Sequence, residues 1–268
     1  MSFGEDSEKE NKQYLANFDA SLESQGISHK TVPSGISGFD EALGEGLVEG
    51  NIYLIISDSG EHSKQISHQI LYHRIISKSR VTYYTFEDSS IDIIEEMAHY
   101  NMHIQKFVDE GTWKFVRIVS SDLKQIIDTL PEHPLDEKVS LEGDIGGLIN
   151  HFSEQMKKNS NTIMQFTHLI RELTPLQIQQ LMLYIKGLSR KYGGIHFIVL
   201  NRGGEYKDKE FVLRDLADSV FDVTTSIKGE ILEITTIIKK ARKMKVNTRK
   251  LNLIEKNGEL STSTIQRI

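Results

Sequence analysis

The chain has 268 residues, of which 38% are hydrophobic and 26% charged, which is enough apolar material for one large domain with its own core. Its formal net charge of −6 argues against a nucleic-acid backbone as the main partner, and the absence of cysteine excludes disulfides, thiolate catalysis and cysteine-bound zinc. No apolar run reaches the roughly 18 residues of a membrane span and residues 1–10 are polar and acidic, so we expect a cytoplasmic protein without membrane insertion.

The N-terminal part of the chain differs in composition from the rest. Residues 1–25 are charged, and we predict a polar tail or a docking helix there. The helical spacing in this part comes from four apolar positions: Tyr14, Leu15, Phe18 and Leu22. Residues 26–268 are expected to form a single domain.

The central feature of the sequence is a strand, a short polar loop and a helix in immediate succession. Residues 52–56 are apolar and include three β-branched isoleucines, and residues 58–65 hold one glycine and one lysine. Apolar residues at helical spacing follow from Ile66 to Ile75. A strand, a phosphate-sized loop and a helix in this order are typical of the triphosphate site of P-loop proteins.

Further strands and helices alternate along the chain. Strands are predicted at 81–86, 114–119, 162–166 and 195–200 and, near the C-terminus, at 220–224, 231–237 and 250–254. Helices are predicted after Ser89, from Ile145 to Met156, and from Thr174-Pro175 to Gly193-Gly194. Residues 120–145 are predicted to be loop-rich. The pattern predicts an α/β fold: a mostly parallel sheet flanked by helices, with C-terminal antiparallel strands.

Several of these segments resemble one known family. Residues 34–50 follow the pattern T-G-I-x-G-L-D-x-x-L-G-G-G-L-x-x-G that precedes the P-loop in KaiC-like members of the RecA superfamily. Residues 84–89 resemble the family's Y-x-x-F-E-E-S, and residues 107–118 resemble the next strand and the turn before it. Residues 217–220 resemble A-D-x-V, and residues 240–242 stand at the place of K-M-R. The resemblance runs in order from about residue 31 to 260 and implies a RecA-like P-loop ATPase core, which FlaH and RadA share.

The loop itself departs from the P-loop pattern G-x-x-x-x-G-K-[ST], whose lysine neutralises phosphate and whose hydroxyl binds Mg²⁺. A gap-free match places His62 at the second glycine, Ser63 at the lysine and Lys64 at the hydroxyl. A shift by one residue restores Lys64, but Gln65 then follows it and no glycine precedes it. The candidate nucleotide-binding residues are those of this degenerate loop: Ser59, Gly60, Glu61, His62, Ser63, Lys64 and Gln65.

The acidic positions of the family are altered in one place and kept in another. Gln165, an uncharged amide, stands at the position of the family's Walker B acid, which supports Mg²⁺. The pattern therefore argues against Mg²⁺ binding and identifies no metal ligand. Glu87 stands at the position of the family's water-activating glutamate, with Asp88 beside it. Glu87 is therefore a vestigial general base or, alternatively, part of an acidic pair that caps a helix.

Two further positions have both a functional and a structural interpretation. Asn201 is either a sensor of the γ-phosphate or a turn residue. Lys240 and Arg242 resemble a pair that reaches a neighbouring subunit's nucleotide across a ring interface. The alternative is a basic surface cluster without interleaved aromatics: Lys239, Lys240, Arg242, Lys243, Lys245, Arg249 and Lys250.

The sequence therefore predicts a KaiC-like fold with degraded Walker A and Walker B motifs. We expect a non-catalytic regulatory or scaffolding subunit that binds ATP weakly, and hydrolysis that is absent or very slow. Its partners would be further copies of itself or an active KaiC/RecA-like paralogue. The alternatives are an ATP/ADP-binding sensor with weak ATPase activity, and a DNA recombinase paralogue, which the acidic composition disfavours.

Overall fold

The computed structural model describes residues 29–58, 60–86, 88–120, 136–141, 145–158, 160–228 and 231–263. The chain divides into two units, Met1–Lys30 and Thr31–Ile268, and the second unit holds the central sheet and the helices that cover it. The prediction of a tail or docking helix over residues 1–25 falls outside the described residues. Within the described ranges, no helix is long and apolar enough to cross a membrane.

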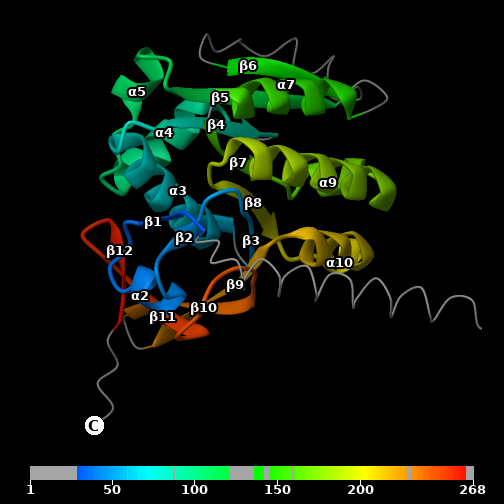
Figure 1. Ribbon diagram of the computed structural model, residues 1–268. Coiled ribbons are helices and arrows are strands. Elements are labelled where there is room, and N and C mark those ends of the chain that lie inside the picture. Colours follow the sequence, from blue (N-terminus) through cyan, green and yellow to red (C-terminus); the bar gives the residue numbers. More distant parts are fainter. Residues whose placement is uncertain are drawn as a thin grey trace, which may run out of the picture. The chain divides into compact units, whose positions relative to one another are not determined.

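A ten-stranded sheet forms the centre of the second unit, in the order β12-β11-β10-β9-β3-β8-β7-β4-β5-β6 (Figure 1). The pairs from β9 through β3 to β6 are parallel, and the pairs from β9 to β12 are antiparallel. Its strands are β3 (Ile52–Ser57), β4 (Arg80–Thr85), β5 (Trp113–Ser120), β6 (Asp136–Leu141), β7 (Ser160–Gln165), β8 (His196–Asn201), β9 (Ser219–Lys228), β10 (Ile231–Ala241), β11 (Lys250–Lys256) and β12 (Glu259–Thr262). A separate antiparallel pair consists of β1 (Thr31–Val32) and β2 (Leu47–Val48).

Helices cover both faces of the parallel part of the sheet (Figure 1). On one face pack α2 (Phe39–Leu43), α3 (Gly60–Ile76), α4 (Ser90–His99) and α5 (Gln105–Asp109). On the other pack α7 (Gly146–Lys157), α8 (Leu169–Glu172), α9 (Pro175–Tyr192) and α10 (Lys207–Leu216), the last preceded by a 3₁₀ turn, η1 (Gly204–Tyr206). Strand β3 contributes Tyr53 and Ile55 to one apolar core and Leu54 and Ile56 to the other, which explains its unbroken apolar sequence.

Helix α3 is buried along most of its length, because both the N-terminal segment around Gly35 and the last strand, β12, lie against it. The Gln69 amide donates to the carbonyl oxygens of Gly35 (3.1 Å) and Leu260 (3.2 Å), and its oxygen accepts from the Leu260 amide (2.8 Å). Ser37 and Thr262 are joined by a backbone hydrogen bond of 2.9 Å. One side chain of α3 therefore fixes the N-terminal segment against the last strand.

The predicted fold class is confirmed, and two of the predicted helix starts have the expected caps. Ser89 and Asp92 form a capping box at the start of α4, as Thr174 and Gln177 do at the start of α9. Each strand predicted from residue 81 onward is present, with boundaries that differ by a few residues.

Two strands of the central sheet are absent from the sequence prediction, as are the short strands β1 and β2 of the separate pair. Residues 136–141, which we predicted as part of a loop-rich region, form β6, where only Val139 and Leu141 are buried. Residues 259–262 form β12, with Leu260 as its one buried residue. Both are edge strands held by the backbone of a neighbour, so their side chains carry little strand signal.

Gly44 provides a test of the loop that leads into β2. It has φ = 95°, and a Cβ there would lie 2.3 Å from the backbone carbonyl oxygen of Lys245. Gly111 also has positive φ, 66°, but a Cβ there meets no atom within 4 Å. We expect Gly111→Ala to cost about 1–2 kcal/mol of unfolding free energy from the left-handed backbone alone, and Gly44→Ala roughly 3 kcal/mol or more because the carbonyl cannot move freely. Urea unfolding of both variants measures this, and equal losses would contradict the proposed close contact.

Candidate functional site

The candidate site lies where four neighbouring parallel strands end. The order β3-β8-β7-β4 brings Ser57, Asn201, Gln165 and Thr85 to the same edge of the sheet, and α3 begins beside it at Gly60. The carboxyl edge of an open α/β sheet is where ligands bind in this class of fold. The loop identified in the sequence is therefore in the position of a phosphate-binding loop.

Lys64, in the second turn of α3, points to the acidic residue that follows β4. Its Nζ lies 2.5 Å from Oδ2 of Asp88 and 3.8 Å from Oε2 of Glu96 on α4. The side chains of Lys64 and Asp88 are 22% and 27% exposed. The ammonium group is thus turned into the protein edge and engages carboxylates of its own chain.

Gln165, at the end of β7, holds the same carboxylate from the other side. Its Nε2 donates to Oδ2 of Asp88 (2.7 Å) and to the hydroxyl of Tyr83 (2.9 Å). Its Oε1 accepts from the Thr85 hydroxyl at 2.9 Å. Both donor hydrogens and the oxygen of the amide are used, so the orientation of this side chain is fixed.

The network closes on itself through α3 and α4. The hydroxyl of Tyr83 lies 3.0 Å from Nε2 of His68, which is one turn after Lys64 on α3. Nδ1 of His68 lies 3.9 Å from Oε1 of Glu96, the residue that also faces Lys64. We call this ring of six side chains the Lys64 network: Lys64, Asp88, Gln165, Tyr83, His68 and Glu96.

Protonation in the network follows from burial and from Lys64. Burial raises the pKa of Asp88, but the hydrogen bond and charge of Lys64 and the hydrogen bond from Gln165 outweigh it, so the net pKa lies below the ordinary value. Burial, with the charge of Lys64, lowers the pKa of His68 to about 3 although Asp88 opposes this. At neutral pH the network therefore holds an ionised Asp88 and a neutral His68.

These residues do not match the donor set of a magnesium site. Mg²⁺ takes oxygen ligands in near-octahedral geometry, and P-loop proteins supply a hydroxyl and an aspartate. At the hydroxyl position stands the ammonium of Lys64, and at the acid position Gln165 directs its nitrogen toward Asp88. No catalytic step through Mg²⁺ can be derived from this arrangement.

The other predicted loop residues are placed less fully. Ser59 and Glu87 lie outside the described residues, and the side chains of Gly60, Glu61 and His62 are likewise not described. Ser63 and Gln65 are fully buried, and neither atom of the Gln65 amide has a hydrogen-bond partner within the described part of the chain. The role of Glu87 as a general base therefore stays a prediction.

Lys240 and Arg242 lie at the opposite end of the sheet from the loop. Lys240 donates to the carbonyl oxygens of Arg214 (3.2 Å) and Asp215 (2.6 Å) and thereby caps the C-terminus of α10. Nη1 of Arg242 is 3.9 Å from the buried carboxylate of Asp218, and its side chain is 42% exposed. The structure does not bring the pair to its own loop, so their contact with a neighbour's nucleotide stays a prediction.

Sequence reasoning missed a second group of charges at the loop. The backbone amide of Arg202 donates a hydrogen bond to the carbonyl oxygen of Ser57, the last residue of β3, at 2.7 Å. Its guanidinium lies 2.6 Å from Oδ1 of Asp58 and also pairs with the buried Asp222. The carboxylate of Asp58, at the start of the loop, is thus paired with an arginine of the same chain. Asn201 is at the same edge, with its Oδ1 3.5 Å from the Ser57 hydroxyl.

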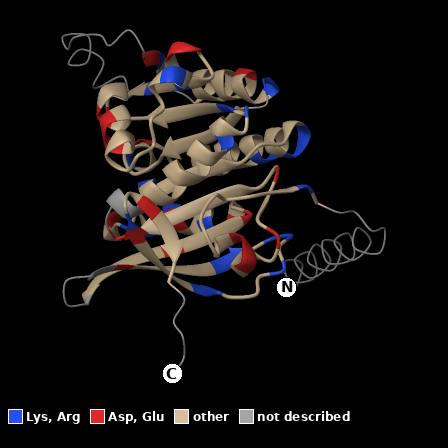
Figure 2. Cartoon of the chain, turned by 90° about the vertical axis from the view of Figure 1, so that its left-hand side faces the viewer, with Lys and Arg blue, Asp and Glu red and all other residues tan. Residues whose placement is uncertain are grey.

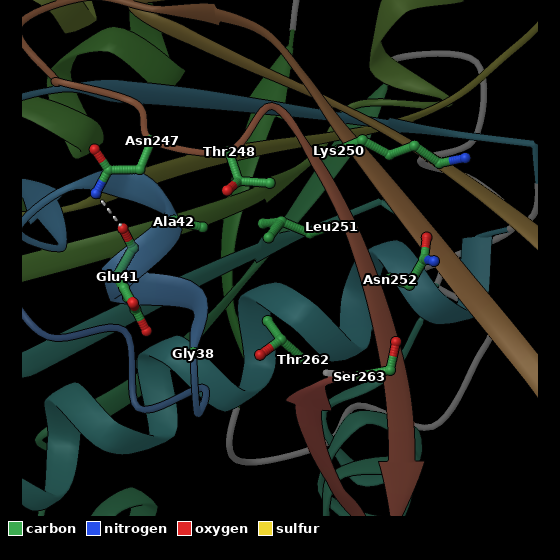
Figure 3. Close-up of a pocket in the computed structure, with 10 residues that line it drawn as sticks. All are labelled: Gly38, Glu41, Ala42, Asn247, Thr248, Lys250, Leu251, Asn252, Thr262 and Ser263. Atoms are coloured by element: carbon green, nitrogen blue, oxygen red, sulfur yellow. Dashed lines mark hydrogen bonds between the residues drawn. The ribbon is translucent and has the colours of Figure 1, made fainter. Parts of the chain in front are cut away.

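A polar hollow of about 360 Å³ lies elsewhere, between α2, the start of β11 and the end of β12 (Figure 3). Asn247 closes one side of it by donating to the Glu41 carbonyl oxygen at 2.8 Å, the dashed line in Figure 3. None of its ten lining residues belongs to the loop or to the Lys64 network. We therefore do not assign this hollow to the nucleotide site.

Comparison with protein families gives one match that covers most of the chain. The family described as ATPase: KaiC matches residues 32–260. This range contains the loop and every member of the Lys64 network. It also agrees with the range over which the sequence motifs resemble that family, so the resemblance is confirmed.

Individual relatives share 30% or less of their residues with this chain over about half of its length. The circadian clock oscillator protein KaiC of Prochlorococcus marinus (strain MED4) is 30% identical over 128 residues, 47% of this chain and 23% of the relative. KaiC of Thermostichus vulcanus is 28% identical over 134 residues, 50% of this chain and 24% of the relative. The aligned part is thus about a quarter of the length of these curated relatives. Among solved structures, a KaiC-like protein from Pyrococcus horikoshii OT3 has a TM-score of 0.67 at 16% identity, covering 88% of this chain and 100% of that one.

The buried histidines predict how stability depends on pH. The pKa values of His68 and His196 are lowered to about 3 and about 4, in both cases mainly by burial. An unfolded histidine has a pKa near 6.5, so below that pH the unfolded chain binds protons that the folded chain does not. Above pH 6.5 these histidines do not reduce the free energy of unfolding. As the pH falls from 6.5 toward 4, the free energy of unfolding decreases by about 1.4 kcal/mol per pH unit for each histidine.

Urea unfolding between pH 7 and pH 4.5 measures this slope. His68→Gln and His196→Gln should each reduce it by the share of one histidine. An unchanged slope in His68→Gln would show that His68 is not held neutral by the fold.

Proposed function

Because the chain belongs to the KaiC family of ATPases, we propose that it is a non-catalytic member of that family, a regulatory or scaffolding subunit with a degraded nucleotide site. The observation that carries this proposal is the 2.5 Å ion pair between Lys64 and Asp88. The one lysine of the loop is engaged by its own chain, at the place where a working site keeps its metal and phosphates.

Electrostatics at the loop supports weak rather than tight ATP binding. Lys64 faces two carboxylates, Asp88 and Glu96, and Asp58 adds a third at the start of the loop, held by Arg202. A triphosphate that approaches this edge must compete with these carboxylates for the same cations. What remains for phosphate is the N-terminus of α3, whose backbone amides and dipole favour anions.

A retained fold with weakened chemistry is suited to assembly. We propose that the chain associates with copies of itself or with an active KaiC-like paralogue, and that Arg242 takes part, since its side chain is 42% exposed while Lys240 is engaged within the chain. Nucleic acid is a poorer candidate: acidic and basic segments are interspersed on the side shown in Figure 2, and the net charge is negative.

The first test of this function is ATP turnover. We expect phosphate release from ATP and Mg²⁺ to be the same for the wild type and for Glu87→Gln, because the metal position lacks its oxygen ligands. Release that the Glu87→Gln variant abolishes would contradict the proposal.

The same samples distinguish the scaffold from a nucleotide sensor. A sensor gains RT ln(1 + [ATP]/Kd) of stability, about 2.7 kcal/mol at 100 times Kd, and shows a raised melting temperature at millimolar ATP.

The second test concerns assembly. We expect light scattering to show an oligomer of the wild type alone or with an active paralogue, and Arg242→Glu to lower its stability by reversing a charge at the interface. Lys256→Glu, an exposed residue on β11, is the matched control. Assembly that both variants leave unchanged would remove Arg242 from the interface, and a monomer under all conditions would refute the scaffolding role.

A further inference from the structure

We propose that the ammonium group of Lys64 replaces the divalent cation of a working P-loop site, so that this chain carries a tethered cation and is closed to Mg²⁺. This inference deepens the proposed function, since it rests on the loop being a modified nucleotide site. It goes further in naming what has taken the metal's place and what would restore the metal.

The first argument is position. In P-loop proteins Mg²⁺ is held between the loop hydroxyl and an aspartate from a neighbouring strand. Lys64 stands at the hydroxyl position and Gln165 at the aspartate position, and both contact the same atom, Oδ2 of Asp88, at 2.5 Å and 2.7 Å. The two altered residues thus meet at one carboxylate oxygen, where a metal would otherwise balance the negative charge.

The second argument is the direction of the hydrogen bonds. The face of Gln165 turned toward Asp88 is its NH₂ group, while its oxygen accepts from Thr85 and its second hydrogen is directed to Tyr83. A metal ion at Asp88 would meet this NH₂ group and the ammonium of Lys64 instead of oxygen ligands. In the described ranges of the chain, no group of three or more His, Asp or Glu side chains is arranged to hold a metal.

The third argument is charge balance. An ammonium carries one positive charge and neutralises one carboxylate, whereas Mg²⁺ carries two. An aspartate at position 165 would place a second carboxylate against Asp88 with only Lys64 to offset both, and two close carboxylates raise each other's cost of ionisation. Glutamine removes that charge and adds a donor. Lys64 and Gln165 therefore compensate for each other at Asp88: the single charge of Lys64 is enough to neutralise the site only because Gln165 brings no second carboxylate.

The consequence can be tested with metal alone. Mn²⁺, which accepts the same oxygen ligands as Mg²⁺ and is visible by electron paramagnetic resonance, is titrated into the full chain without nucleotide. Asp88→Asn supplies the blank, since Mn²⁺ that it still binds lies elsewhere. The test pair is Gln165→Asp, which restores the acid but keeps the lysine, and the double variant Lys64→Thr/Gln165→Asp, which restores both oxygen ligands.

We expect wild type and Gln165→Asp to bind no more Mn²⁺ than the blank, and the double variant to bind one Mn²⁺ at least about tenfold more tightly than Gln165→Asp, a difference of about 1.4 kcal/mol. Equal affinity of Gln165→Asp and the double variant would overturn the proposal, because the lysine would then not exclude the metal. Wild-type binding that Asp88→Asn abolishes would overturn it as well.

Circular dichroism checks the fold of each variant. If the double variant does not fold, Lys64→Ala/Gln165→Asp decides, since it restores the acid and removes the ammonium: tighter Mn²⁺ binding than Gln165→Asp supports the proposal, and equal binding overturns it. No nucleotide is present, so these results are independent of the turnover assay. A chain that fails to hydrolyse ATP yet binds Mn²⁺ at Asp88 would keep the proposed function and refute the tethered cation.

Discussion

The carboxylate of Asp88 is the constraint on which the arrangement of this site depends. It is partly buried just after β4, with 27% of its side chain exposed, and a carboxylate in such a place is kept ionised by pairing and hydrogen bonds. Lys64 supplies the charge, and Gln165 supplies a hydrogen bond that an ionised acid could not give. Replacing one of these residues alone would leave a desolvated group without its partner, which is why the changes at the loop and at the distant strand belong together.

Helix α3 connects this site to the rest of the fold. Its second and third turns carry Lys64 and His68 toward Asp88 and Tyr83, and the residue after His68, Gln69, joins Gly35 to Leu260. A helix with both sets of contacts is held in place by the fold itself, independently of any ligand at the loop before it. The fold can therefore be preserved for its contacts while the chemistry at one end of the helix changes.

The sequence was sufficient for the fold because buried parallel strands have long apolar runs, and β3 and β8 are of this kind. It also singled out Lys64 and Gln165, since these fall at motif positions, but a role of Lys64 in nucleotide binding stays a prediction. The partners of these residues could not be predicted in the same way. Thr85 and Gln165 are 80 positions apart and meet only because β4 and β7 pair in one register. His68 is the exception, because its spacing of four from Lys64 places both on one face of a helix. The hydrogen bonds of Lys240 were not predictable for a similar reason: its place at the end of α10 depends on how β10 packs, which no local pattern records.

The charges at the loop explain how this site is balanced by its own side chains. In an active P-loop site, phosphates and metal neutralise groups that would otherwise be unbalanced, so the site is poised to bind them. Here Lys64 is balanced by Asp88, and Arg202 is balanced by Asp58 and Asp222. An incoming phosphate would have to break a formed ion pair to reach Lys64 or Arg202, whereas the backbone amides at the start of α3 could bind it without such a cost.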